Sequence, residues 1–227
     1  MLTRSPRGLL RFMEKPLDNR STSRYSAHMN IVAEPVDLRE HILDVAQTII
    51  GAKGYSAVGL TEILSAANVP KGSFYYYFKS KDAFGEALLH RYFEKYLAEL
   101  DSTLGAAGFT MGQRLTNYFV NWQQTQESCD CQGKCLAVKL GAEVVDLSEA
   151  MRLSLKAGTS GIINRLQKAI EAGIEEGSIR TESNASITAH TLYQLWLGAS
   201  LMAKINRSVE PFKSAMMMTK EILGLKT

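Results

Sequence analysis

The sequence has no apolar run near the roughly 20 residues that a helix needs to cross a membrane. Its early apolar patch, Leu9 and Leu10, is broken by Arg11 and is too short for the core of a signal peptide. Cysteine is scarce too: the 227 residues include three, an odd count that argues against a disulfide scaffold. We therefore expect a cytoplasmic protein with no membrane span.

A strong charge of one sign is also lacking. The net charge is only +3, and residues 1–30 hold six basic against two acidic side chains, so the remainder is close to neutral. This excludes a uniformly basic coat for nucleic acid. With 45% hydrophobic residues, a chain of this length can bury a sizeable core.

Strand signals are missing as well, because no stretch alternates apolar and polar residues between turns. No internal repeat appears. Helical spacing is present instead from residue 37 onward, so the sequence predicts an all-α fold. The predicted helices cover 38–53, 60–67, 71–78, 81–104, 111–127, 133–145, 147–176 (with a break near Gly158 and Gly161), 186–207 and 211–223.

Residues 1–36 have no sustained periodicity and contain three of the five prolines. We expect a disordered arm here. A basic arm can touch DNA phosphates. The alternative is that Met29 is the natural start and that residues 1–28 are an upstream extension without function.

Local signals fix the first helices. Asp37 followed by Glu40 predicts a capping box, and Gly54 suits a left-handed residue after the first helix. Asn68 falls where a sharp turn wants a positive φ, which Asn tolerates better than most residues. Val69 is placed to fill the angle between the two helices that this turn joins.

The short helix after this turn has two different faces. Phe74 and Phe78 share the i, i+4 face and should pack inward, which turns polar and phenolic side chains outward. Such groups can bond phosphates and base edges, and Gly72 lets a backbone approach a groove closely. Lys81 begins the next helix, where a positive charge is unfavourable to the helix macrodipole. A DNA phosphate near this helix start would explain the lysine, and a lysine that is simply solvated is the alternative.

The stretch NVPKGSFYYYF (68–78) resembles the turn and recognition helix of the tetracycline-repressor family of bacterial transcription factors. Asn68, Pro70 and Tyr76 depart from the usual Gly, Ser and His, and Gly59 from a capping Thr. The resemblance implies a three-helix helix-turn-helix DNA-binding domain at 37–82 and a helical regulatory and dimerisation domain at 83–227. Operator DNA and a second copy would be the partners, with dimer contacts from 153–177 and 185–207. The residues assigned to DNA contact are Thr61, Lys71, Gly72, Ser73, Tyr75, Tyr76 and Lys81.

All three cysteines lie close together, at 129, 131 and 135. We expect Cys135 at a helix start with Lys139 one turn on, an arrangement that lowers a thiol pKa and makes the thiolate reactive. A buried, inert thiol is one alternative. A soft metal ion on the three thiolates is another, but no His lies nearby to complete a zinc site.

A second resemblance concerns the sensor. Cys135–Arg152 and Leu192–Pro211 are similar to parts of the N-ethylmaleimide- and bleach-responsive, electrophile-sensing repressors of this family. There, a cysteine and a lysine form a redox switch, and the matching positions are Cys135 and Lys204. Cys129 and Cys131 are not part of that pattern. They are either resolving thiols that form a disulfide with Cys135 or residues of a loop without a role, and we favour the second interpretation.

A ligand pocket could be lined by Trp122, Tyr193, Trp196 and Met202, although such residues at helical spacing are more often core. We expect no cofactor, no metal and no catalysis, since Cys135 has no convincing His or acid partner in the sequence. The sequence thus predicts a homodimeric DNA-binding repressor that an electrophile or oxidant releases through Cys135. The main alternative is the same fold with a reversibly bound apolar ligand.

Overall fold

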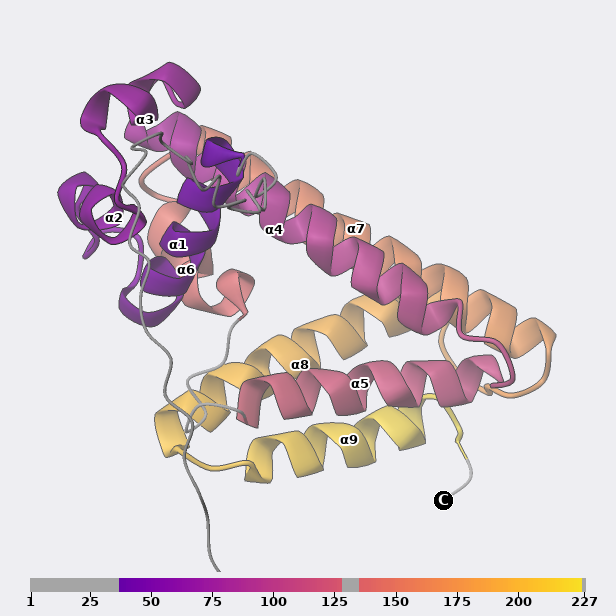
Figure 1. The fold of residues 1–227 in the computed structure, drawn as a ribbon. Helices are drawn as coiled ribbons and strands as arrows, with labels where there is room; N and C mark the ends of the chain where they lie inside the picture. The colour runs from indigo at the N-terminus through magenta and orange to yellow at the C-terminus, as the bar shows by residue number, and fades with distance from the viewer. Residues whose placement is uncertain (1–36, 128–134, 226–227) are drawn as a thin grey trace, which may run out of the picture. The chain divides into compact units, whose positions relative to one another are not determined.

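The structure, a computed structural model, describes residues 37–127 and 135–225, so the predicted arm lies outside the described residues. Within these two ranges the regular elements are all helices and no strand occurs, as the sequence predicts (Figure 1). None of these helices is both long and apolar enough to cross a membrane. The bounds are α1 (Leu38–Lys53), α2 (Leu60–Ala67), α3 (Lys71–Tyr77), α4 (Lys81–Leu104), α5 (Met111–Glu127), α6 (Leu136–Val144), α7 (Glu149–Glu175), α8 (Ala185–Asn206) and α9 (Glu210–Ile222).

Helix α1 begins at a capped terminus and ends at a glycine. The Asp37 carboxylate accepts hydrogen bonds from the backbone N–H groups of Arg39 and Glu40. The predicted capping box is only half formed, because the Glu40 side chain turns to Arg91 of α4 instead of back to the cap. Gly54 has φ 95° and ψ 163°, so its φ is positive but it is not the left-handed helical residue that we predicted.

The turn between α2 and α3 contains the predicted left-handed residue. Asn68 has φ 54° and ψ 46°, and its side chain is one of the few that tolerate this region. Val69 is buried behind it. Pro70 precedes α3 as its N-cap. The turn is therefore specified by adjacent residues that each suit their own backbone position.

Helix α3 is held by aromatic contacts rather than by its own length. Phe74 and Phe78 are buried as predicted, and their ring centroids are 5.1 Å apart. Phe84 of α4 packs on both rings, at 5.3 Å and 5.1 Å. Ser80 caps α4 by accepting a hydrogen bond from the Ala83 N–H at 3.0 Å. The start of α4 thus fixes a helix of two turns that would not be stable alone.

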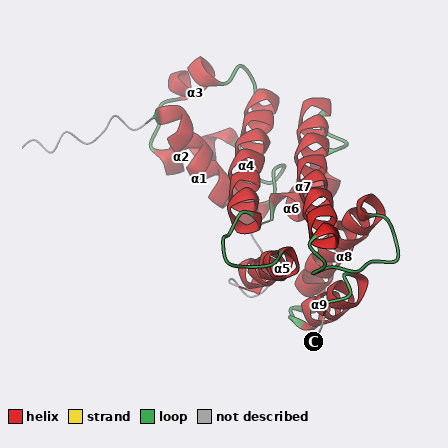
Figure 2. Cartoon of the chain, turned by 90° about the vertical axis from the view of Figure 1, so that its right-hand side faces the viewer, coloured by secondary structure: helices red, strands yellow, loops and turns green. Residues whose placement is uncertain are grey.

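The two longest helices, α4 and α7, pack along each other (Figure 2). A Cβ atom on Gly158 of α7 would lie 2.1 Å from Cγ of Phe93, and one on Gly161 would lie 3.1 Å from Leu97. These glycines therefore let α4 approach closely. The break that we predicted in α7 near them is wrong, because packing against α4 outweighs the weak helix propensity of glycine.

Helices α5, α8 and α9 share an aromatic core. Trp196 of α8 is fully buried and stacks between Phe119 of α5 and Phe212 of α9, with centroids 4.8 Å and 5.9 Å away. Its indole N–H donates to the hydroxyl of Thr219 at 2.9 Å. This pairing satisfies the one polar group that the indole takes into the core.

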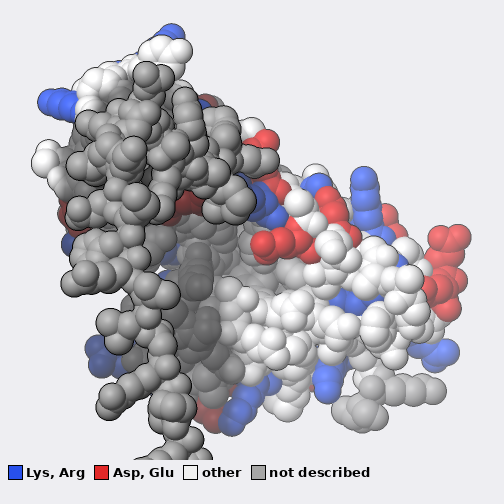
Figure 3. All heavy atoms as spheres, viewed as in Figure 1, with Lys and Arg blue, Asp and Glu red and all other residues white. Residues whose placement is uncertain are grey.

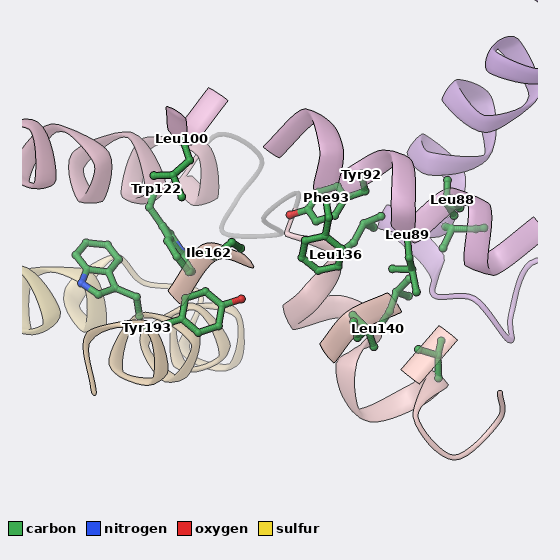
Figure 4. Close-up of a cluster of buried hydrophobic side chains, with 14 of the residues drawn as sticks. Leu88, Leu89, Tyr92, Phe93, Leu100, Trp122, Leu136, Leu140, Ile162 and Tyr193 are labelled. Atoms are coloured by element: carbon green, nitrogen blue, oxygen red, sulfur yellow. The ribbon is translucent and has the colours of Figure 1, made fainter. Parts of the chain in front are cut away.

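Short helix α6 sits between the head and the rest of the chain. It begins at Leu136, later than predicted, with Cys135 as its N-cap. Leu136 and Leu140 are buried, and Figure 4 shows them beside Leu89 and Phe93 of α4. Helix α6 packs against α7 and α8, so these helices determine which face of α6 turns inward.

Candidate functional site

The outer face of α3 carries exposed phenols and a lysine. The exposed fraction is 83% for Tyr76 and 49% for Tyr75, and the Lys71 ammonium lies over the Tyr75 ring at 5.9 Å from its centroid. Residues 70–81 include no acidic side chain. Figure 3 shows Lys and Arg side chains at this tip of the head. The surface is suited to phosphates and base edges.

The other predicted contact residues of α2 and α3 lie around this face. Thr61 is exposed in the first turn of α2, and Ser73 is half-buried on α3. Nothing lies within 4 Å of a Cβ built on Gly72, so a ligand backbone can come close there. The N-cap of α2, Gly59, has no side chain to bond the first-turn N–H groups.

Lys81 has internal partners that the sequence did not reveal. Its ammonium donates to the carbonyl oxygens of Val58 at 3.0 Å and Tyr55 at 3.4 Å, and it lies over the Tyr55 ring at 4.8 Å. The Tyr55 hydroxyl in turn donates to the Lys81 carbonyl at 2.5 Å. The ammonium therefore ties the loop after α1 to the start of α4, and its contact with a phosphate stays a prediction.

A buried arginine fixes α1 on α4. Arg91 is 5% exposed; its Nε donates to Glu40 at 2.5 Å, and its Nη2 pairs with Asp44. The hydrogen bond from Arg91 is the main cause that lowers the pKa of Asp44. Sequence reasoning missed this pair, although an arginine on the otherwise apolar face of α4 was a signal for it.

Two charged side chains of helix α6 form hydrogen bonds with the head. The Glu143 carboxylate accepts the backbone N–H groups of Tyr55 at 3.1 Å and Ser56 at 2.5 Å. Lys139 donates to the carbonyl of Ala52, near the end of α1, at 3.0 Å. The sequence predicted Lys139 beside the thiol and did not reveal the role of Glu143. The backbone groups that bond these two side chains are 87 and 88 residues away in the sequence.

Cys135 is buried, with 8% of its surface exposed, and it lines a cavity of about 580 Å³. The cavity lies among α1, α4, α5 and the start of α6. Its walls combine aromatic rings with amide and hydroxyl groups, a composition typical of small-molecule sites. The lining residues are Gln47, Tyr92, Lys95, Tyr96, Glu99, Leu100, Ser102, Thr103, Tyr118, Asn121, Trp122, Thr125, Gln126 and Cys135.

The structure brings Lys204 of α8 close enough to Cys135 for their charges to interact. Burial lowers the pKa of Lys204 below its ordinary value; a Cys135 thiolate opposes this shift and the Lys139 charge adds to it. A lowered pKa increases the share of neutral, nucleophilic amine. Cys135 and Lys204 thus lie within range of a charge interaction, and their role as a switch stays a prediction.

Four tyrosine phenols lie within range of the charge of the Cys135 sulfur. Burial raises the pKa of Tyr92 well above its ordinary value, and the charge of Cys135 and a hydrogen bond with Cys135 raise it further. Burial likewise raises the pKa of Tyr96, Tyr118 and Tyr193, with a further contribution from Cys135. These phenols stay protonated, and the Tyr92 hydroxyl can donate its hydrogen bond to a negative sulfur.

Of the four residues predicted for a ligand pocket, only Trp122 lines this cavity. Tyr193 and Trp196 are buried in the aromatic core, which was our alternative for them. Met202 is 45% exposed, because it lies on the outer side of α8. Periodicity alone could not distinguish a residue that faces the core from one that faces a cavity.

Cys129 and Cys131 lie outside the described residues, so their predicted roles are untested. Among residues 37–127 and 135–225, no three side chains of His, Cys, Asp or Glu are grouped as a metal site would require. The metal alternative, which needs all three thiols, thus also involves residues that the structure does not describe.

A helix-turn-helix head with an exposed, non-acidic third helix, joined to a larger helical part, is the architecture of a DNA-binding regulator. Two family models match this chain: "Bacterial regulatory proteins, tetR family" over residues 42–88, and "Tetracyclin repressor-like, C-terminal domain" over residues 112–219. The chain belongs to the tetR family of transcriptional repressors. Regulators of this family bind operator DNA and act as dimers.

Individual relatives agree with this assignment. The chain is 41% identical to the HTH-type transcriptional repressor NemR of Escherichia coli K12 over 191 residues, which are 83% of this chain and 94% of NemR. It is 35% identical to the repressor DhaR of Mycobacterium sp. GP1 over 82% of this chain and 92% of DhaR. The crystal structure of reduced E. coli NemR superimposes with a TM-score of 0.80 at 39% identity, covering 84% of this chain and 99% of NemR.

Proposed function

We propose that this repressor leaves its operator when an electrophile or oxidant modifies Cys135. The observation that carries the proposal is the position of this thiol: it lines the cavity, occupies the N-cap position of α6 and is within range of the charge of Lys204. The cavity gives a small reagent access to a residue that is otherwise buried. The similarity to NemR over most of the chain, together with the description of one NemR crystal structure as a reduced form, supports redox-dependent control.

Two kinds of reagent suit this pair. The thiolate attacks the activated double bond of a carbon electrophile such as N-ethylmaleimide: a carbon–sulfur bond forms, the carbon–carbon π bond breaks, and the adjacent carbon takes up a proton. An oxidant such as hypochlorite takes two electrons from the sulfur and leaves a sulfenic acid. The neutral amine of Lys204 can then attack that sulfur, which forms a sulfur–nitrogen bond and releases water. Each product enlarges the group at the N-cap of α6.

Helix α6 is the direct route from the sulfur to the head. Cys135 is the N-cap of α6, and Lys139 and Glu143 follow one and two turns later. Each of these two side chains is hydrogen-bonded to the backbone near the C-terminal end of α1. A shift of α6 therefore pulls on the loop of residues 54–56. The change acts as a population shift toward heads that are wrongly spaced for the operator.

At the operator, two copies of α3 would enter successive major grooves about 34 Å apart. Within each copy, the proposed contacts come from Lys71, Tyr75 and Tyr76 on the outer face of α3, with Thr61 and Ser73 beside them. A recognition helix of two turns reads few base pairs, so pairing of two heads is needed for useful specificity.

The proposed dimer contact is the outer side of α8. Exposed residues recur there at helical spacing, with Ile187, Leu201 and Ile205 as the apolar members and Gly198 between them. Nothing lies within 4 Å of a Cβ built on Gly198, so another helix can approach closely. This stripe lies within the predicted dimer segment 185–207.

The test uses Cys135→Ser. N-ethylmaleimide should release the unmodified sequence from operator DNA and leave the Ser variant bound, while mass spectrometry locates the adduct on Cys135. Cys129→Ser and Cys131→Ser serve as matched controls that should respond normally. If the Cys135→Ser protein is still released by the reagent, the thiol switch is wrong. Reversible induction by an apolar ligand, with an inert Cys135, would then be the better account.

A further inference from the structure

Of the four phenols within range of the Cys135 charge, one also shares a hydrogen bond with the sulfur. This is Tyr92 of α4, whose hydroxyl is hydrogen-bonded with Cys135. The hydroxyls of Tyr96 and Tyr118 are bonded to each other, at 2.9 Å. Tyr193 interacts with Cys135 through charge. Because a phenol has only one proton to donate, Tyr92 is the residue that can direct its proton at the sulfur.

Packing fixes the place of the Tyr92 ring. Tyr92 and Cys135 are 9% and 8% exposed, and both line the same cavity. The ring contacts Phe93 edge to face, with centroids 5.1 Å apart, and the Tyr96 ring at 6.0 Å. Figure 4 shows Tyr92 and Phe93 of α4 close to Leu136, which directly follows Cys135. The hydroxyl is therefore held near the start of α6, because a closely packed ring has little space to turn.

The charged side chains around the thiol stabilise its anion only in part. Burial lowers the pKa of Lys204, which increases the neutral share of this lysine. The Lys139 ammonium is bonded to the Ala52 carbonyl at 3.0 Å. Lys95 and Glu99, at the rim of the cavity, are exposed and carry opposite charges. A direct hydrogen bond from an uncharged donor can therefore supply stabilisation that these charges do not.

We propose that Tyr92 donates a hydrogen bond to the Cys135 thiolate and that this bond makes the thiol reactive at neutral pH. The inference rests on the proposed function, in which the sulfur is the atom that reagents attack. A hydrogen bond to the ionised form of a group favours ionisation, and the thiolate is the nucleophilic form of cysteine. Because burial raises the pKa of Tyr92 well above its ordinary value, the phenol keeps its proton while the thiol titrates.

The experiment uses Tyr92→Phe, which removes the hydroxyl and keeps the ring. Cys129 and Cys131 are replaced by serine in every protein compared, so Cys135 is the only thiol of the chain. Iodoacetamide is the probe: the thiolate displaces iodide, a carbon–sulfur bond forms, and mass spectrometry follows the adduct from acidic to alkaline pH. The pH of half-maximal rate should rise by about one unit, so the reaction below this pH becomes about tenfold slower. Above both midpoints the two proteins should react at similar rates.

Tyr96→Phe is the matched control. It also removes one phenol hydroxyl from the cavity wall, but this hydroxyl is bonded to Tyr118. Its midpoint should stay at the value of the protein that has both tyrosines. A further protein carries 3-fluorotyrosine at position 92. Fluorine makes the phenol a stronger donor, so the midpoint should fall, and this protein keeps the test possible if Tyr92→Phe fails to fold.

The outcomes separate a lost hydrogen bond from a change of access. An unchanged midpoint in Tyr92→Phe overturns the proposal, and so does a rate that falls equally at every pH, because that pattern reports hindered access to the sulfur. Operator release is measured after complete modification of Cys135, when the rate of modification no longer matters. Release then tests the thiol switch and the pH profile tests Tyr92, so either can fail alone.

Discussion

Glu143→Gln tests whether α6 connects the thiol to the DNA-binding head. The carboxylate of Glu143 accepts two backbone N–H groups, from Tyr55 at 3.1 Å and from Ser56 at 2.5 Å. The amide of a glutamine keeps one oxygen and presents an NH₂ group in place of the other. One of the two N–H groups therefore loses its acceptor, and the remaining bond loses the charge that strengthens it.

The magnitude follows from this loss. A hydrogen bond to a charged group contributes about 1.5–3 kcal/mol. Because Glu143 is half-buried, solvent screens part of this, and we expect about 1–2 kcal/mol. That corresponds to a factor of about 5–30 in the coupling between α6 and residues 54–56. The melting temperature should fall by about 2–8 °C for a chain of this size.

The pH dependence has a definite sign. Burial raises the pKa of Glu143, but hydrogen bonds from Ser56 and Tyr55 and the charge of Lys139 outweigh it, so the pKa lies below its ordinary value. A carboxyl whose pKa is lowered in the folded state stabilises it above the unfolded pKa, near 4.3. The link should hold at neutral pH and weaken as the pH falls through the lower, folded-state pKa.

The assay compares operator affinity before and after complete modification of Cys135 with N-ethylmaleimide, checked by mass spectrometry. In Glu143→Gln the difference between the two states should shrink by about 5–30-fold. Asp146→Asn, an exposed carboxylate three residues further on, is the matched control and should keep the full difference. Equal behaviour of the two variants would refute α6 as the route.

Further substitutions test the packing, the DNA contact and the dimer. Gly158→Ala should lower the free energy of unfolding by about 1–3 kcal/mol, because its Cβ would lie 2.1 Å from the Phe93 ring; Gly141→Ala, with open space, should raise it by about 0.5–1 kcal/mol in the same denaturant titration. Lys71→Met should reduce the slope of log affinity against log salt by about 1 if the ammonium contacts a phosphate, and Tyr76→Phe should cost about 1–3 kcal/mol of operator binding if its hydroxyl contacts a base. Gly198→Arg should convert the dimer to monomers in sedimentation velocity, and unchanged sedimentation would contradict the α8 contact.

Local signals predicted much of the head. The turn at Asn68 and the inward face of Phe74 and Phe78 depend on residues within one or two helical turns, where φ preferences and i, i+4 spacing decide the outcome. The predicted helix ends in the second half of the chain lie within a few residues of the observed ones for the same reason. The break predicted at Gly158 failed, since the contact with Phe93 comes from another helix.

The sequence alone determined that this chain is helical, that residues 60–81 form a helix-turn-helix with an outward phenolic face, and that Cys135 and Lys204 are the candidates for a switch. Only the tertiary structure decided how these parts are connected. Glu143 bonds to the loop after α1, 88 positions away, and Arg91 pairs with Glu40, 51 positions away. The cavity beside the thiol is lined by residues from more than two helices. Periodicity reports which face of a helix is apolar, whereas the partner of that face depends on chain packing that no local pattern encodes.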